Sequence, residues 1–119
     1  MSTSVTVRQP ITSERVHRFL SNELHHFSKS ERNILAVRVT NVEGHIKWWV
    51  PRVLRWLQPE RNRRVGAVIL FQHRSSMRPP FAIRQGWRVI ENPYAYRAVP
   101  RSLINAISAL DESAAWEAD

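Results

Sequence analysis

Apolar residues recur at helical spacing between Thr12 and Ser28, and polar residues fill the opposite side of that segment. Thr12 is a favourable N-cap residue, and Ile11 is placed to pack against Val16 across the first turn. The pattern therefore predicts an amphipathic helix from Thr12 to about Ser28. Its buried stripe consists of Val16, Leu20, Leu24 and Phe27.

Two segments have the pattern of extended chain. Alternating Thr and Val residues predict that residues 1–10 form an extended arm, which is either an edge strand or disordered. Between Asn33 and Thr40 the chain is rich in β-branched residues and too short for a typical helix. This run predicts a strand that buries Leu35, Val37 and Val39.

The stretch from His45 to Leu57 contains three of the five tryptophans. Turn-forming residues at 41–44 are followed by strict alternation, which predicts a hairpin after the first strand. In this interpretation one face of the second hairpin strand is buried and carries Ile46, Trp48 and Val50. The other face carries His45, Lys47 and Trp49, so that Trp49 is at least partly exposed.

Pro51 suits the first turn of a short helix that Pro59 ends, with an apolar stripe of Val53, Leu54 and Leu57. The competing interpretation is a single helix from about Gly44 to Gln58, kinked at Pro51, because the apolar residues of this stretch also fit a helical period. We favour the hairpin because a proline inside a helix costs about 3 kcal/mol.

The run from Val65 to Phe71 is apolar on both faces, which predicts a central strand. A proline-containing connection follows, and then a second alternating strand. That strand is predicted to bury Phe81, Ile83, Trp87 and Val89 and to expose Arg84, Gly86 and Arg88. Residues 94–98 are a further candidate edge strand. Pro100 begins the last helix, whose predicted stripe is Leu103, Ile107, Leu110 and Ala114.

The predicted element order is α-β-β-α-β-β-α, with an optional extra strand before the last helix. Such an order predicts an α+β fold, in which an antiparallel sheet of about four strands has its helices packed on one face. A chain of 119 residues fits one compact domain, spanning 1–119. Residues 1–10 would be its extended arm and residues 111–119 an acidic tail.

Charge adds a functional argument to this picture. The formal net charge is +8, and sixteen of the eighteen cations are arginine. Residues 44–101 hold twelve cations and two anions, whereas residues 102–119 hold four anions and no cation. Guanidinium binds phosphate in a bidentate manner and stacks on rings, so this surplus favours a nucleic acid or an acidic protein as partner. An arginine-rich genome would leave the same composition. The acidic tail is expected either to lie against the basic middle of the chain or to repel phosphate.

Several chemistries lack the residues they need. The chain has no cysteine, which excludes disulfides and thiolate metal sites, and it has no phosphate-binding glycine motif or G-x-S-x-G sequence. Glu23-x-x-His26 is a weak metal signal, since a histidine-rich exposed helix face is the commoner case. We therefore expect no cofactor. Neither a signal peptide nor an apolar run long enough for a membrane span is present, so a soluble intracellular protein is expected, cytoplasmic or nuclear depending on its source.

These observations predict a basic nucleic-acid-binding accessory protein that binds RNA rather than DNA, through backbone and stacking contacts and without sequence readout. A compact, cysteine-free chain rich in Arg and Trp is typical of viral, phage or mobile-element proteins. The predicted binding residues are Lys47, Trp49, Arg52, Arg55, Trp56, Arg61, Arg63, Arg64, Arg74, Arg78, Arg84 and Arg88.

Two alternatives remain open. In the first, an exposed tryptophan patch docks a partner protein, an acidic one or a second copy of the chain. In the second, the chain is a small basic ribonuclease of the toxin type, which needs only Arg, His and Tyr groups around a scissile phosphate. The groups available for that chemistry are His73, Arg74, Arg84, Tyr94 and Tyr96, provided that the fold brings them together.

Overall fold

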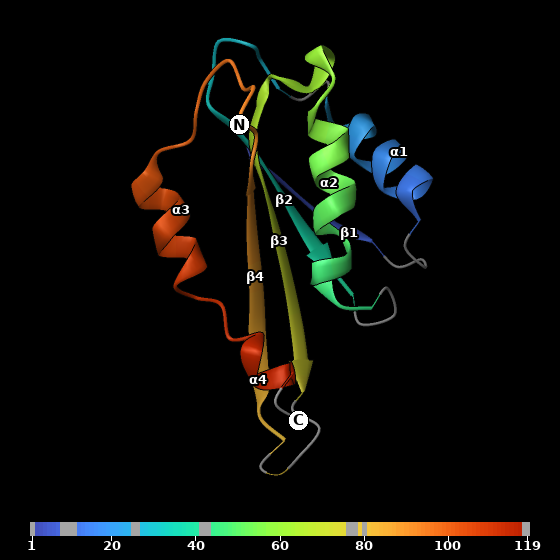
Figure 1. The fold of residues 1–119 in the computed structure, drawn as a ribbon, viewed down its shortest axis with the longest axis vertical. Helices are drawn as coiled ribbons and strands as arrows, with labels where there is room; N and C mark the ends of the chain where they lie inside the picture. The colour runs from blue at the N-terminus through green and yellow to red at the C-terminus, as the bar shows by residue number, and fades with distance from the viewer. Residues whose placement is uncertain are drawn as a thin grey trace.

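The protein is an α+β structure built on a mixed sheet (Figure 1). The computed structural model describes residues 2–7, 12–24, 27–40, 44–75, 79 and 81–117, with backbone only for residues 2–7 and 117. The strand order is β1-β2-β3-β4. The strands are β1 (Ser2–Val7), β2 (Asn33–Val39), β3 (Val65–Ser75) and β4 (Ile83–Glu91). The helices are α1 (Ser13–Glu23), α2 (Val50–Leu57), α3 (Arg101–Ser108) and α4 (Ala114–Glu117).

The prediction of an antiparallel sheet is wrong. β1 pairs parallel to β2 and β2 parallel to β3, and only β4 is antiparallel to its neighbour. The cause is that a helix, rather than a hairpin strand, follows β2, so that the chain crosses over before it forms β3. Because such crossovers are right-handed and the strands are added in one direction, α1 and α2 lie on the same face of the sheet.

The prediction that all helices pack on one face is also wrong. Figure 1 shows α3 on the opposite side of the sheet from α1 and α2. α1 and α2 cover the main core, to which β2, β3 and β4 contribute Leu35, Val68 and Ile90, respectively. A smaller cluster of Ala67, Val99 and Ile104 lies beneath α3. We call these two sides of the sheet the α1/α2 face and the α3 face.

Helix α1 begins as predicted. The Thr12 side chain accepts a hydrogen bond from the Arg15 backbone nitrogen at 3.2 Å, and Val16 and Leu20 are buried. The helix ends at Glu23 rather than near Ser28, and buried Phe27 packs on the core from the segment that follows. The proposed Ile11 contact and the Glu23-x-x-His26 pair involve residues outside the described part of the chain.

Strand β2 is confirmed, with Leu35, Val37 and Val39 fully buried. The hairpin strand predicted after it is wrong. Ile46–Trp48 is a 3₁₀ helix, η3, that leads directly into α2, and Pro51 occupies the first turn of α2 as expected for a helix start. The helical interpretation of this stretch was therefore nearer, although Pro51 lies in the first turn of α2, which begins at Val50, instead of kinking a longer helix.

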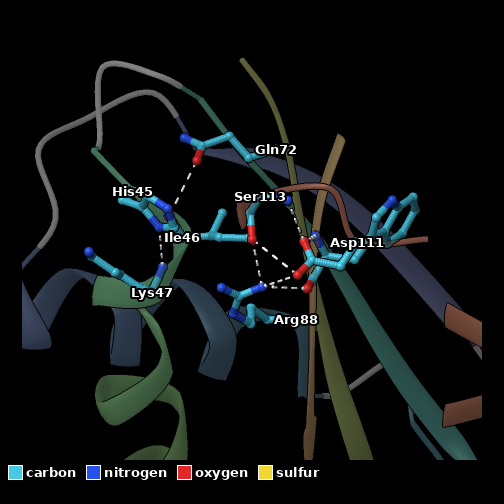
Figure 2. Close-up of polar contacts among 8 residues, drawn as sticks. His45, Ile46, Lys47, Gln72, Arg88, Asp111 and Ser113 are labelled. Atoms are coloured by element: carbon cyan, nitrogen blue, oxygen red, sulfur yellow. Dashed lines mark hydrogen bonds and ion pairs between the residues drawn. The ribbon is translucent and has the colours of Figure 1, made fainter. Parts of the chain in front are cut away.

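Strand β3 is central, as predicted, and its first six residues are buried. Its one fully buried polar side chain within the described residues is Gln72. The Gln72 amide nitrogen donates to the carbonyl oxygens of Thr40 (3.1 Å) and Gly44 (2.7 Å), and its amide oxygen accepts from the backbone nitrogen of Ile46 at 3.3 Å. Gln72 thereby fixes the start of η3 against the sheet, as Figure 2 shows for the Ile46 contact.

Strand β4 exists as predicted, but its faces were assigned wrongly. Gly86 and Ile90 are buried on the α1/α2 face, whereas Ile83 is 73% exposed. Phe81, which precedes the strand, is 57% exposed. The side chains of β4 do alternate between the two faces of the sheet. Because helices pack on both sides, neither face of β4 is wholly buried or wholly exposed.

The segment between β4 and α3 is not a strand. Asn92 holds it as a loop by donating to the carbonyl oxygens of Asn62 (3.3 Å) and Val65 (3.0 Å). Helix α3 follows Pro100 as predicted. Its buried residue is Ile104, the predicted Ile107 is half-buried, and the predicted Leu103 is exposed; Leu110 and Ala114 lie beyond the end of the helix.

Candidate nucleic-acid interface

The predicted binding residues of the η3–α2 stretch divide into exposed cations and buried rings. Lys47 and Arg55 are exposed, and Arg52 donates from its guanidinium to the carbonyl oxygen of Trp48. Trp49 is 1% exposed and Trp56 is 2% exposed. The prediction that Trp49 faces solvent is therefore wrong, and neither ring is accessible for stacking on a base.

The reason is the helical period. Trp49, Val53 and Trp56 are separated by four and three residues, which places them on the same side of a helix, and all three pack in the main core. Trp56 also donates from its indole nitrogen to the Ser21 hydroxyl at 2.9 Å, a contact that ties α2 to α1. The exposed ring of this stretch is Trp48 instead, with 51% of its surface accessible.

A second group of predicted residues lies at the beginning of β3. Arg61 is exposed on the 3₁₀ helix η4 (Glu60–Asn62), and the Arg63 guanidinium carbon lies 5.7 Å from the centre of the Tyr94 ring. Arg64 donates to the carbonyl oxygen of Phe27 at 3.5 Å. Since β3 is eleven residues long, this group is about 30 Å along the strand from the opposite end of the sheet.

The third group lies at that opposite end, where β3 and β4 extend beyond β2 as a two-stranded ribbon. Arg74 and Arg84 are directly opposite each other in the strand register, and Arg88 follows on the same side of β4. We call Arg74, Arg84 and Arg88 the arginine row. It belongs to the α1/α2 face, because it shares that side of β4 with Gly86 and Ile90. Arg78 lies outside the described residues.

The arginine row is covered by the C-terminal segment, which we define as residues 111–116. Arg88 is 2.7 Å from an Asp111 carboxylate oxygen and donates to the Ser113 hydroxyl at 3.0 Å (Figure 2). Arg84 is 3.4 Å from the Glu112 carboxylate. The Arg74 guanidinium carbon lies 5.6 Å from the centre of the Trp116 ring. The expectation that the acidic tail lies against the basic middle of the chain is thus met by these residues.

Asp111 has an unusual electrostatic environment. Partial burial raises the pKa of this carboxyl, but hydrogen bonds from the Trp87 and Ser113 backbone nitrogens and from the Ser113 hydroxyl lower it, as does the charge of Arg88. The lowering contributions prevail, and the pKa of Asp111 lies below its ordinary value. The carboxylate is therefore ionised, and paired with Arg88, over the whole physiological pH range.

The α3 face of the same ribbon carries a surface that the predicted residue set missed. The rings of Phe71 and Trp87 stack at 5.3 Å with an interplanar angle of 25°. The His73 ring lies 6.5 Å from Phe71, and the Trp87 indole nitrogen donates to the Gln85 amide oxygen at 3.1 Å. Arg38 pairs with Phe71 in the register of β2 and β3. We call Arg38, Phe71, His73, Gln85 and Trp87 the aromatic platform.

The platform is accessible because α3 does not extend over it. Helix α3 packs near Ala67 and Val89, toward the other end of the strands. At the platform end, Arg38, His73 and Gln85 are exposed and the two stacked rings are partly exposed. A sequence signal for this site did exist. Alternate positions of two adjacent predicted strands carry Phe71, His73, Gln85 and Trp87, but Trp87 was expected to be a core residue.

The residues considered for a ribonuclease are not brought together. His73 lies on the α3 face of the ribbon, Arg74 and Arg84 lie on the α1/α2 face, and Tyr94 lies near the other end of β3 beside Arg63. Tyr96 is tied to the same end, since its backbone nitrogen donates to the Arg63 carbonyl oxygen at 2.9 Å. Among the described residues, no group of three or more His, Asp or Glu side chains is arranged to hold a metal ion.

Comparison with known proteins gives no relative for this chain. No family model matches it, and neither the curated proteins nor the solved structures contain a match. Within the described residues, none of the helices is long and apolar enough to cross a membrane. The functional argument therefore depends on the geometry of the aromatic platform and the arginine row.

Proposed function

We propose that the protein binds single-stranded RNA on the aromatic platform, without sequence readout. The observation that carries this proposal is the stacked Phe71–Trp87 pair, which lies partly exposed on a sheet face between charged and polar side chains. Flat rings on an exposed sheet surface offer unpaired bases a stacking partner, and each base has a π-face to offer in return.

The surroundings of the two rings support a nucleic-acid ligand over an apolar one. Arg38 is exposed beside Phe71, and its guanidinium can pair with a phosphate or stack on a base. His73 and Gln85 are register partners that add hydrogen-bonding groups at the next position of the ribbon. The chain as a whole carries +8, which attracts a polyanion and accelerates its encounter.

Single-stranded RNA is favoured over a duplex because the proposed contacts are stacks between rings and unpaired bases. Bases in a duplex are already stacked, and only duplex ends present a free face. The preference for RNA over single-stranded DNA rests on the 2′-hydroxyl, which the polar platform residues are able to recognise.

The test is binding of labelled single-stranded RNA, duplex RNA and duplex DNA to the parent chain and to three variants. Trp87→Ala should weaken single-strand binding by roughly 1–3 kcal/mol, the usual value of one aromatic stack. Arg38→Ala should lower the slope of log affinity against log salt by about 0.7, the share of one phosphate on a single strand. Trp48→Ala is the matched control, since it removes an exposed tryptophan outside the platform.

Equal affinities for Trp87→Ala and Trp48→Ala, measured on folded protein, would contradict the platform proposal. Because Trp87 is partly buried, Arg38→Ala serves as the second measurement at an exposed position, where a loss of fold is not expected. A preference of the parent for duplex over single-stranded RNA would equally overturn the proposal.

A partner protein is the second candidate, and the exposed Trp48 and Leu54 on η3 and α2 favour it. Exposed large apolar side chains near cations can serve as anchors for a protein surface. The same variant set distinguishes the two candidates. A partner-docking protein would lose binding with Trp48→Ala, and its affinity would depend only weakly on salt.

A further inference from the structure

The β3–β4 ribbon has a second charged side that the aromatic platform does not use. Arg74 and Arg84 are paired directly across the two strands, and Arg88 lies further along β4 on the same side. Like charges directly opposite each other on a sheet are destabilising. An anionic group that lies beside both arginines would offset this repulsion.

In this structure the compensating partner is the C-terminal segment. It runs beside the free edge of β4, where the Glu112 backbone nitrogen donates to the Gln85 carbonyl oxygen at 2.8 Å and the Gln85 backbone nitrogen donates to the Glu112 carboxylate at 3.2 Å. The Asp111 carboxylate accepts from the Trp87 backbone nitrogen at 2.9 Å. Two carboxylates therefore contact the arginine row and the edge of the strand together, and Figure 2 shows Asp111 and Ser113 converging on Arg88.

An indole completes the attachment. An added Cβ on Gly86 would lie 2.3 Å from the Trp116 ring, so the absence of a side chain at Gly86 makes room for that ring between Arg84 and Arg88. The Trp116 ring also meets His45 edge to face at 5.4 Å. The row thus holds two anionic groups and one flat ring, which are the kinds of group that a strand of RNA presents as phosphates and a base.

The attachment is weakest at Arg84, whereas Arg88 and the strand edge are held by closer contacts. The Arg84–Glu112 pair is partly solvated, with 42% and 44% of the two side chains exposed, and such pairs contribute little to stability. The helix α4, to which residues 114–116 of the segment belong, has four residues, too few to be stable by itself. A polyanion that meets the row at high local concentration can therefore displace the segment.

We propose that the arginine row is a second phosphate-binding site of the protein, and that the C-terminal segment occupies it as an intramolecular competitor. This inference rests on the proposed function in that RNA held by the aromatic platform is the ligand that displaces the segment. The ribbon then stacks bases on its α3 face and binds phosphates on its α1/α2 face. Release of the segment adds two guanidinium groups, Arg84 and Arg88, to the contact.

The experiment compares two double variants of equal net charge. Asp111→Asn with Glu112→Gln removes the carboxylates that cover the row. Glu14→Gln with Glu91→Gln is the matched control, because each of those residues pairs with an exposed arginine elsewhere, Arg18 or Arg101. Binding of a labelled oligouridylate about twelve nucleotides long is measured over a range of salt concentrations, since single-strand sites span roughly 4–16 nucleotides.

The first double variant should bind more tightly at low salt, and its slope of log affinity against log salt should be steeper than that of the control by about 1.4, the share of two phosphates. Gly86→Ala is a variant without a charge change. Its Cβ would displace the Trp116 ring, so it should steepen the slope in the same direction. Equal slopes for the two double variants, with Gly86→Ala like the parent, would overturn the proposal.

A second probe separates this proposal from the proposed function. Inorganic polyphosphate has no bases and reports on the arginine row alone. If oligouridylate fails to bind any variant but polyphosphate binds the Asp111→Asn/Glu112→Gln variant more tightly than the control, the second site stands and the RNA function fails. If oligouridylate binds through Trp87 while polyphosphate does not distinguish the two double variants, the RNA function stands and the competitor role fails.

Discussion

Trp48 and Trp49 are adjacent in the chain but have opposite environments. Trp49 is enclosed by the main core, with 1% of its surface exposed, while Trp48 has 51% exposed. The Trp48 ring covers Gly44, whose positive φ of 86° is a conformation that favours glycine. One ring is therefore a structural residue and the other a surface residue, although both are surrounded by the same apolar and basic sequence.

This contrast gives a prediction for two single substitutions. Trp49→Ala should lower the free energy of unfolding by about 3–5 kcal/mol, because it leaves a large cavity between α2 and the sheet. Trp48→Ala should lower it by less than about 1 kcal/mol, because half of the ring is already in solvent. Urea unfolding of the two variants and the parent checks both values. Similar destabilisation by the two substitutions would show that the environments of the two rings are not different.

At the scale of the element, β3 organises the molecule. Among the described strands, β3 alone has partners on both sides and buries all of its first six residues. It also carries Gln72, which holds η3, and Arg74, which belongs to the arginine row. β4 depends on β3 for its position, because the contacts described at its free edge are the few hydrogen bonds of the C-terminal segment. The ribbon formed by the two strands carries both proposed binding surfaces.

A charge placed in β3 should unfold the domain. Ile69→Asp buries an unpaired carboxylate in the second half of the buried run, a change that costs several kcal/mol. Ile83→Asp is the control, since Ile83 lies on the same face in the adjacent strand but is 73% exposed. Circular dichroism and thermal unfolding should show loss of structure for Ile69→Asp and a nearly unchanged melting temperature for Ile83→Asp. A parent-like melting curve for Ile69→Asp would contradict the position of β3.

At the scale of the whole molecule, the net charge of +8 is not spread as one surface. Within the described residues the predicted binding arginines fall at the start of β3, on α2 and on the ribbon, and those of the ribbon are paired with the C-terminal segment. Repulsion among the positive charges of the chain is weakest where a carboxylate is paired with an arginine. The stability of the folded chain should therefore depend on the ionisation of Asp111.

The direction of that dependence follows from the lowered pKa of Asp111. A carboxyl whose folded pKa is below its ordinary value of 3.8 contributes stability that is fully present above that value. The contribution is lost as pH falls through the lower folded pKa. The difference in unfolding free energy between the parent and Asp111→Asn should thus be constant from neutral pH to about pH 5 and shrink at lower pH. Urea unfolding across this range tests it, and a difference that grows on acidification would contradict the assigned direction.

Much of the local structure was predictable from the sequence. The N-cap at Thr12, the buried alternation of β2 and the doubly apolar run of β3 are determined by short-range patterns, because each has one structure that buries its apolar residues and satisfies its backbone. The start of α3 after Pro100 and the position of Pro51 in the first turn of α2 follow equally from the fixed φ of proline. The concentration of positive charge in the middle of the chain is likewise a property of the sequence.

The arrangement of these elements was decided by the tertiary structure. The apolar residues between Ile46 and Leu57 fit both a strand and a helix, and the choice depended on contacts such as that of Gln72 with Ile46, which are formed by residues far apart in the chain. Because this stretch is helical, Trp49 lies in the core and the chain crosses over to form β3 parallel to β2. Which side of β4 faces α2, and which arginines the C-terminal segment reaches, were decided in the same way. Such contacts depend on how whole elements pack, and a pattern within one segment does not contain that information.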